Sequence, residues 1–168
     1  MRMFAYLLVL LSAFCVGFEL NRVQKERMKL IKSFSKLTEY MYAELSVRPC
    51  GVGELCWKAA NIYEGQTKMF LVAVNDAMSN LGEKSFREIW AECCVDKLSL
   101  LDKEALEIIV ALGESLGNFE LSAQLKAIDS CSKALGKEYQ IIKEAYPNNR
   151  KLNIAVPCSV ACMILMAI

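Results

Sequence analysis

The longest apolar stretches in this sequence lie at its two ends. Residues 3–18 and residues 154–168 contain no charged side chain. A helix that crosses the hydrocarbon core of a bilayer needs roughly 17–25 residues. With their neighbours included the two stretches reach this length, so we predict transmembrane helices at residues 1–20 and 152–168. The alternative for the second stretch is a C-terminal helix buried in a soluble core.

A cleaved signal peptide is the main alternative for the first segment, because Arg2 precedes its apolar core. Cleavage needs small residues near the end of that core, but the bulky Phe14 and Phe18 and the charged Glu19 stand there. A lipoprotein signal at Cys15 would likewise need a small residue in place of Phe14. We therefore favour an uncleaved anchor.

Between the two segments, apolar residues recur every three or four positions, which is the spacing of amphipathic helices. The alternation at every second position that is typical of strands does not occur over a useful length. Apolar stripes about one helix face wide favour helices that pack against one another. The predicted fold class is therefore all-α: a helical bundle at residues 21–151, flanked by N-terminal and C-terminal transmembrane helices.

Prolines, glycines and capping residues divide the bundle into helices. Residues 30–45 continue the first apolar segment as one long helix, which Pro49 and Gly51 end. Five further helices are predicted: residues 55–62, ended by Gly65; residues 66–81, ended by Gly82; one opened by a capping box of Ser85 and Glu88; one capped by Asp102 and ended by Gly117 and Asn118; and one from Glu120 to Ile142, broken by Pro147.

The same spacing predicts which side chains face the core. Met69 and Phe70 are predicted to point inward, and Trp90 and Cys93 should share the inward side of the next helix. Trp57 and Trp90 are more typical of core or interface positions than of cofactor stacking.

Two residues near the predicted turn at Gly117 and Asn118 have structural roles that the structure can test. Gln124 either bonds the backbone of a neighbouring helix or faces water. Gly117 is predicted to be left-handed, so that a valine there would strain the turn.

Charge orients the chain relative to a membrane. Positions 22–36 hold six basic residues and one acidic residue, and Lys143, Arg150 and Lys151 precede the second apolar segment. Basic residues that flank membrane spans stay on the cytoplasmic side. Both flanks therefore predict a cytoplasmic bundle, with the two termini across the membrane.

The formal net charge of +1 hides an asymmetry along the chain. Residues 54–120 contain twelve acidic and six basic residues, a net of −6. An acidic surface argues against nucleic acid as a partner and suits a basic protein partner. Hydrophobic residues make up 55 % of the chain and the mean hydropathy is +0.27, which also favours a membrane component.

Residues for catalysis are scarce in this sequence. It contains no histidine, so the commonest general base and most zinc sites are absent. Its eight cysteines lack metal-binding spacing and, in a reduced cytoplasm, behave as small apolar residues. Glu104 and Glu107 could form a carboxylate pair, but a solvated helix face explains them equally well. We therefore predict a non-enzymatic protein with no catalytic, cofactor-binding or metal-binding residues.

Residues 101–124 read LDKEALEIIVALGESLGNFELSAQ, and this stretch resembles the stage III sporulation protein AB family. An acidic helix start is followed by a G-x-x-L-G turn and then by a glutamine. Trp90 before the charged helix and a basic entry at residues 149–152 also match. The resemblance covers nearly the whole chain, although Phe119 and Pro157 depart from the family pattern. It marks five candidate structural or interface residues: Asp102, Gly113, Leu116, Gly117 and Gln124.

The resemblance implies a place in the export-like complex that connects mother cell and forespore. It implies a platform in the outer forespore membrane whose helical domain lies in the mother-cell cytoplasm. Such a domain would be similar to the cytoplasmic domains of type II secretion and type IV pilus platform proteins. The implied partners are the membrane, the other stage III sporulation A proteins, especially the stage III sporulation protein AA ATPase, and further copies of this chain. The alternative is a two-span adaptor or sensor unrelated to sporulation.

Overall fold

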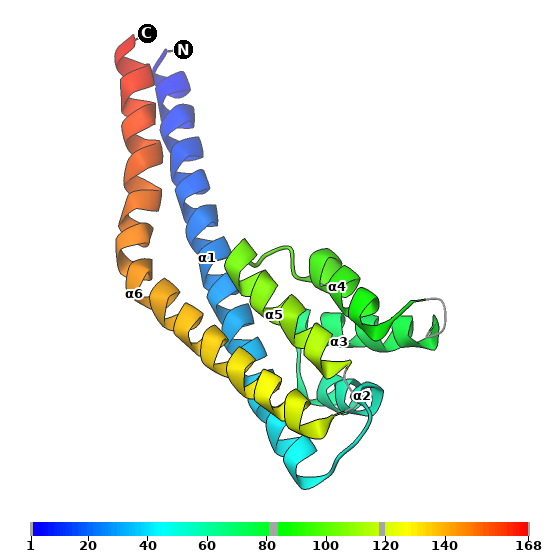
Figure 1. The fold of residues 1–168 in the computed structure, drawn as a ribbon. Helices are drawn as coiled ribbons and strands as arrows, with labels where there is room; N and C mark the ends of the chain where they lie inside the picture. Colours follow the sequence, from blue (N-terminus) through cyan, green and yellow to red (C-terminus); the bar gives the residue numbers. More distant parts are fainter. Residues whose placement is uncertain (1, 81–83, 118–119, 168) are drawn as a thin grey trace. The chain divides into compact units, whose positions relative to one another are not determined.

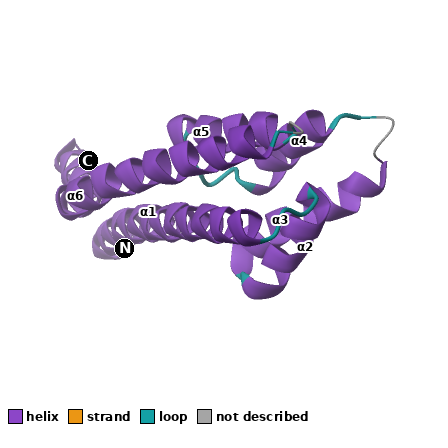
Figure 2. Cartoon of the chain, turned by 60° about the horizontal axis from the view of Figure 1, so that its bottom comes forward, coloured by secondary structure: helices purple, strands orange, loops and turns teal. Residues whose placement is uncertain are grey.

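The computed structural model describes residues 2–80, 84–117 and 120–167, and the elements in these ranges are all helices (Figures 1 and 2). The predicted all-α class is therefore confirmed. The elements are α1 (Arg2–Val47), α2 (Val52–Ile62), α3 (Gly65–Ala77), the 3₁₀ helix η1 (Met78–Asn80), α4 (Phe86–Lys97), α5 (Lys103–Leu116) and α6 (Leu121–Ala167).

The long helices α1 and α6 each contribute to two compact units. Residues 2–28 and 140–167 form the first, which we call the terminal helix pair, and residues 29–139 form the second, the helical domain. The terminal helix pair is antiparallel, with the two termini at the same end (Figure 1).

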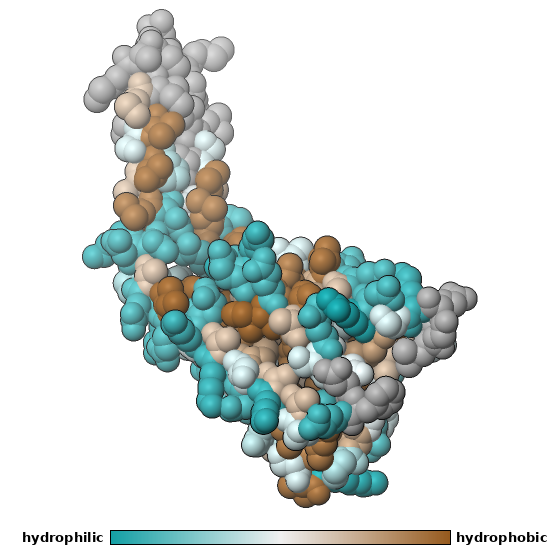
Figure 3. Space-filling view, viewed as in Figure 1, coloured by the Kyte–Doolittle hydropathy of each residue, from teal (hydrophilic) through white to brown (hydrophobic). Residues whose placement is uncertain are grey.

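The terminal helix pair leaves many apolar side chains exposed. On the face shown in Figure 3, apolar residues run along both of its helices. Phe18 on α1 is 66 % exposed, whereas Gly17 beside it is buried against the other helix. No helix in the described ranges combines the length and hydropathy needed to cross a membrane. The predicted transmembrane helices at residues 1–20 and 152–168 are therefore not confirmed.

The helical domain has an apolar core centred on three aromatic rings. The ring centroid of Phe70 on α3 lies 5.4 Å from that of Phe34 on α1 and 4.9 Å from that of Trp90 on α4. Phe70 and Trp90 meet edge to face, an arrangement that aromatic quadrupoles favour. These contacts hold α1, α3 and α4 together, and α2 and α5 pack on α3 and α4 respectively.

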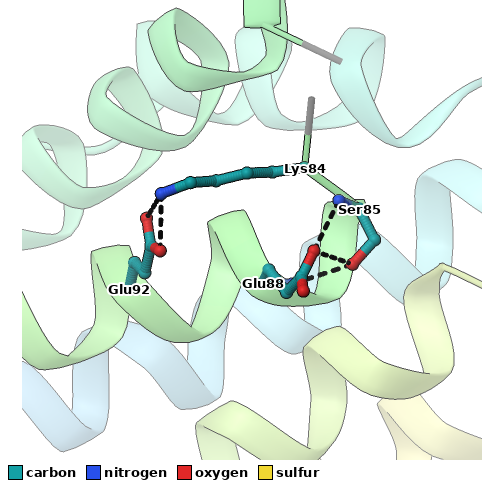
Figure 4. Close-up of polar contacts among 4 residues, drawn as sticks. All are labelled: Lys84, Ser85, Glu88 and Glu92. Atoms are coloured by element: carbon teal, nitrogen blue, oxygen red, sulfur yellow. Dashed lines mark hydrogen bonds and ion pairs between the residues drawn. The ribbon is translucent and has the colours of Figure 1, made fainter. Parts of the chain in front are cut away.

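The start of α4 is set by the predicted capping box, which is confirmed (Figure 4). The backbone N–H of Ser85 donates to Oε2 of Glu88 at 2.8 Å, and the backbone N–H of Glu88 donates back to Oγ of Ser85 at 3.4 Å. The hydrogen bond from the Ser85 backbone lowers the pKa of the Glu88 carboxyl. Nearby, Lys84 donates to Glu92 at 2.6 Å. The helix therefore begins where the sequence signal placed it.

The end of α1 also follows its sequence signal, because the helix stops at Val47, just before Pro49. The prediction for Gly65 needs correction. The preceding helix ends at Ile62, where extended Tyr63 takes over, and Gly65 is instead the first residue of α3. Its φ of 63° lies in the left-handed region, which glycine adopts without steric cost.

The prediction that Pro147 breaks the last helix is wrong, because α6 continues through both Pro147 and Pro157. An interior proline loses one backbone hydrogen bond and costs about 3 kcal/mol. The segment after Pro147 packs against α1, where Asn153 donates to Asn21 at 3.1 Å. We infer that such contacts offset the local cost.

The prediction of which α3 side chains point inward also needs correction. Met69 is 61 % exposed, and Thr67 is buried instead. The Thr67 hydroxyl donates to Oγ of Ser33 on α1 at 2.8 Å, so a cross-helix hydrogen bond orients this face. On α4, Cys94 is buried and Cys93 is only partly so. The predictions that involve Leu81, Gly82 and Asn118 lie outside the described residues.

Candidate interaction site

Four of the five residues singled out by the sequence lie around the connection between α5 and α6. Gly113 and Leu116 are in the last turn of α5, Gly117 is its C-cap, and Gln124 is in the first turn of α6. Asp102 is the N-cap of α5, at the other end of a 14-residue helix, and does not join them.

Gly113 makes room for the indole of Trp90. A Cβ atom at Gly113 would overlap Cδ1 of Trp90, far inside van der Waals contact. Trp90 is 1 % exposed, and its Nε1 donates to the backbone carbonyl of Ile109 at 2.8 Å. The indole therefore packs closely against α5. Gly113 therefore serves the packing of α4 on α5, which spacing along the sequence did not reveal.

Gln124 joins the start of α6 to the end of α5. Its side-chain Nε2 donates to the backbone carbonyl of Leu116 at 3.0 Å. Leu116 is the last residue of α5, so its carbonyl has no partner in a following helical turn. Of the two roles open for Gln124, the structure supports the bond to a neighbouring backbone.

The predicted left-handed conformation of Gly117 is wrong. Its φ of −71° and ψ of −9° are right-handed, and its N–H donates to the carbonyl of Gly113 at 3.3 Å. A Cβ atom there would meet Phe86 at 3.7 Å, an ordinary contact. The backbone therefore stays right-handed at this C-cap, and a side chain at this position is not strained. Within the described residues, Gly65 is the glycine with a positive φ.

An open groove of about 500 Å³ adjoins this connection. Its lining is mostly apolar and comes from six parts of the helical domain: the turn between α1 and α2, the start of α2, η1, α4, the end of α5 and the start of α6. The lining residues are Pro49, Cys50, Gly51, Val52, Met78, Phe86, Leu116, Gly117, Leu121 and Gln124. Three of the five candidate residues thus share one surface. Sequence reasoning missed Met78 and Phe86, because only folding brings them there.

The groove offers a binding surface rather than reactive groups. Burial raises the pKa of the Cys50 thiol, and Glu54 raises it further, so this cysteine stays protonated. Away from the groove, burial raises the pKa of Cys56 to about 12, which makes that thiol unreactive. The proposed carboxylate pair is exposed on α5, where Glu107 pairs with Lys103 at 3.7 Å. Glu104 and Glu107 therefore fit a solvated face.

Comparison with known proteins agrees with this fold. The family model described as "Stage III sporulation protein AB" matches residues 2–167. A solved structure of "Stage III sporulation protein AB (SpoIIIAB)" has a TM-score of 0.65 and 18 % sequence identity, over 73 % of this chain and 97 % of that chain. At this identity the structure shows a shared fold. A search of curated proteins finds no match. Because the family model covers nearly the whole sequence, this chain belongs to the stage III sporulation protein AB family.

Proposed function

We propose that this protein is a non-enzymatic membrane platform of the channel between mother cell and forespore. In this role the helical domain binds the stage III sporulation protein AA ATPase in the mother-cell cytoplasm, and the terminal helix pair holds the assembly in the outer forespore membrane. Membership of the family supports a role in sporulation. The membrane role and the partner are parts of the proposal.

One observation carries the membrane part: the distribution of apolar surface. Within the terminal helix pair, large apolar side chains are exposed on both helices, a pattern that water disfavours and lipid accepts. They are Leu11, Phe14, Val16, Phe18, Leu20, Val23, Ile141, Leu152, Val156, Val160 and Met163. Their number and their spread over both helices favour a lipid environment for this unit.

The partner part rests on the groove. It is apolar, it adjoins the residues that carry the family resemblance, and it belongs to a unit with excess acid. Residues 29–139 contain 16 acidic and 13 basic residues, a formal net charge of −3. Apolar contact surrounded by complementary charge is how many protein interfaces are built. A basic ATPase surface with an apolar side chain at its centre would fit.

Binding can be tested with the full-length protein in nanodiscs and the purified ATPase. Val52 lines the groove and opens α2, where a first-turn carboxylate is compatible with the helix. Val52→Glu should therefore weaken binding about tenfold without unfolding the domain. Val95→Glu is the control, because Val95 is exposed on α4 and is not among the groove residues.

Equal binding by wild type and both variants would exclude the groove as the docking site. Absence of any binding by folded wild-type protein would argue against the platform role. Deletion of the gene should block sporulation after engulfment, and normal spores would contradict the sporulation role.

A further inference from the structure

The terminal helix pair brings together two basic segments that are far apart in the sequence. Nδ2 of Asn21 on α1 lies 3.5 Å from the carbonyl oxygen of Arg150 on α6, to which it donates. Nδ2 of Asn153 donates in turn to Oδ1 of Asn21 at 3.1 Å. These bonds place residue 21 at the level of residues 150–153.

The two backbones are also close at this level. A Cβ atom at Gly17 would lie 2.6 Å from the carbonyl oxygen of Asn153 and 3.1 Å from Cα of Ile154. Glycine at this position therefore lets the helices approach, as small residues do in membrane helix pairs. The level defined by the asparagines is consequently a close helix–helix contact rather than a distant crossing.

Four exposed basic side chains gather at this level, and we call them the basic collar: Arg22, Lys25, Arg150 and Lys151. Arg22 pairs with Glu19 at 3.5 Å, but both side chains are more than half exposed, so water weakens that pair. Glu26 and Glu144 are the other acids of this unit. Over residues 1–28 and 140–168 there are seven basic and three acidic residues, a formal net charge of +4.

Exposed apolar side chains adjoin the collar on the side of the termini. Phe18 and Leu20 on α1 and Leu152 and Val156 on α6 are all exposed. An anionic phospholipid presents this same combination, a phosphate headgroup next to an apolar chain. A soluble phosphate would use only the charges and would leave the apolar side chains in water.

We propose that the basic collar binds the phosphate groups of anionic phospholipids. Arginine can hold a phosphate through two parallel hydrogen bonds, and lysine adds charge. The two helices each contribute two of the four residues, so the site depends on their antiparallel pairing. This inference rests on the membrane part of the proposed function and adds the class of lipid that the protein selects.

The test uses full-length protein in nanodiscs that contain equal amounts of phosphatidylglycerol and phosphatidylcholine. Electron paramagnetic resonance of spin-labelled lipids gives the relative association of each lipid with the protein. We expect wild type to prefer phosphatidylglycerol, because each basic residue near an anionic surface changes affinity on the order of fivefold. The double variants Arg22→Gln/Lys25→Gln and Arg150→Gln/Lys151→Gln should each lose most of this preference.

The matched control is Lys68→Gln/Lys103→Gln, which removes two exposed lysines from the helical domain. It should leave the lipid preference unchanged. An equal loss in this control, or no preference in wild type, would overturn the proposal. So would displacement of the lipid preference by inorganic phosphate at constant ionic strength, because that result identifies a site for free phosphate.

The outcomes also separate this inference from the proposed function. Protein that enters the nanodisc and binds the ATPase, but shows no preference for anionic lipid, would exclude lipid binding by the basic collar and leave the proposed function intact. Protein that stays folded in solution and does not enter the nanodisc would overturn both.

Discussion

The terminal helix pair and the helical domain use the same two long helices but treat apolar side chains in opposite ways. In the helical domain Phe34, Phe70 and Trp90 are almost fully buried. In the terminal helix pair Phe18 is mainly exposed, while the small Gly17 is buried at the helix contact. The helical domain buries large apolar residues, whereas the terminal helix pair exposes large apolar residues and buries a glycine.

This difference indicates two ways of holding helices together. Burial of large apolar side chains stabilises the helical domain through the hydrophobic effect. The terminal helix pair relies on close backbone approach and on the bond between Asn21 and Asn153. Small residues and polar contacts are what pair helices in lipid, where apolar burial brings no gain.

The largest effect is expected from Trp90→Ala in the helical domain. Removing a fully buried indole and leaving a cavity should lower the free energy of unfolding by about 3–5 kcal/mol. Thermal unfolding of full-length protein in detergent, followed by circular dichroism, measures the loss. An equal truncation at the exposed Trp57 is the control, and a similar loss there would contradict the assigned core.

Gly113→Ala should lower the free energy of unfolding by about 2 kcal/mol, because the new methyl group overlaps the buried indole of Trp90. The matched control is Gly136→Ala, since Gly136 lies inside α6 with open space around it. There alanine should stabilise by about 0.5–1 kcal/mol through helix propensity alone. Stability changes of opposite sign in the two variants would support the close contact, and a gain in stability at both positions would exclude it.

In the terminal helix pair, Gly17→Ala should destabilise the helix contact by about 1 kcal/mol, because its methyl group would meet the carbonyl oxygen of Asn153. Hydrogen exchange of residues 150–156 reports this local opening. Exchange of residues 86–116 serves as the internal control and should not change. Faster exchange in both segments would mean that the two units do not open independently.

The smallest effect is expected from Asn153→Ala, which removes one hydrogen bond to Asn21. Polar bonds between helices in lipid contribute about 0.6 kcal/mol on average. The same hydrogen-exchange experiment in nanodiscs should therefore show only a slight increase at residues 150–156. A larger increase in exchange than the one caused by Gly17→Ala would show that the asparagine pair, rather than close backbone approach, contributes most to the stability of this unit.

Local sequence signals predicted several elements correctly. Pro49 marked the end of α1, and Ser85 with Glu88 marked the start of α4. Each signal acts within about one helical turn, so nearby residues suffice to read it. The same kind of reasoning failed at Pro147, where α6 continued through the residue that was predicted to break it. At Gly117 the signal correctly marked the end of α5, but the predicted left-handed backbone conformation is wrong.

The all-α class, the family resemblance and the two charge-poor apolar ends could be read from the amino-acid sequence, because these depend on composition and on short-range periodicity. The packing of Trp90 against Gly113, the hydrogen bond from Gln124 to Leu116 and the hydrogen bond between Asn153 and Asn21 became visible in the folded chain. The partners in these contacts lie 8 to 132 residues apart in the chain. Such pairings follow from how the helices pack, and neither spacing nor residue type reveals them in advance.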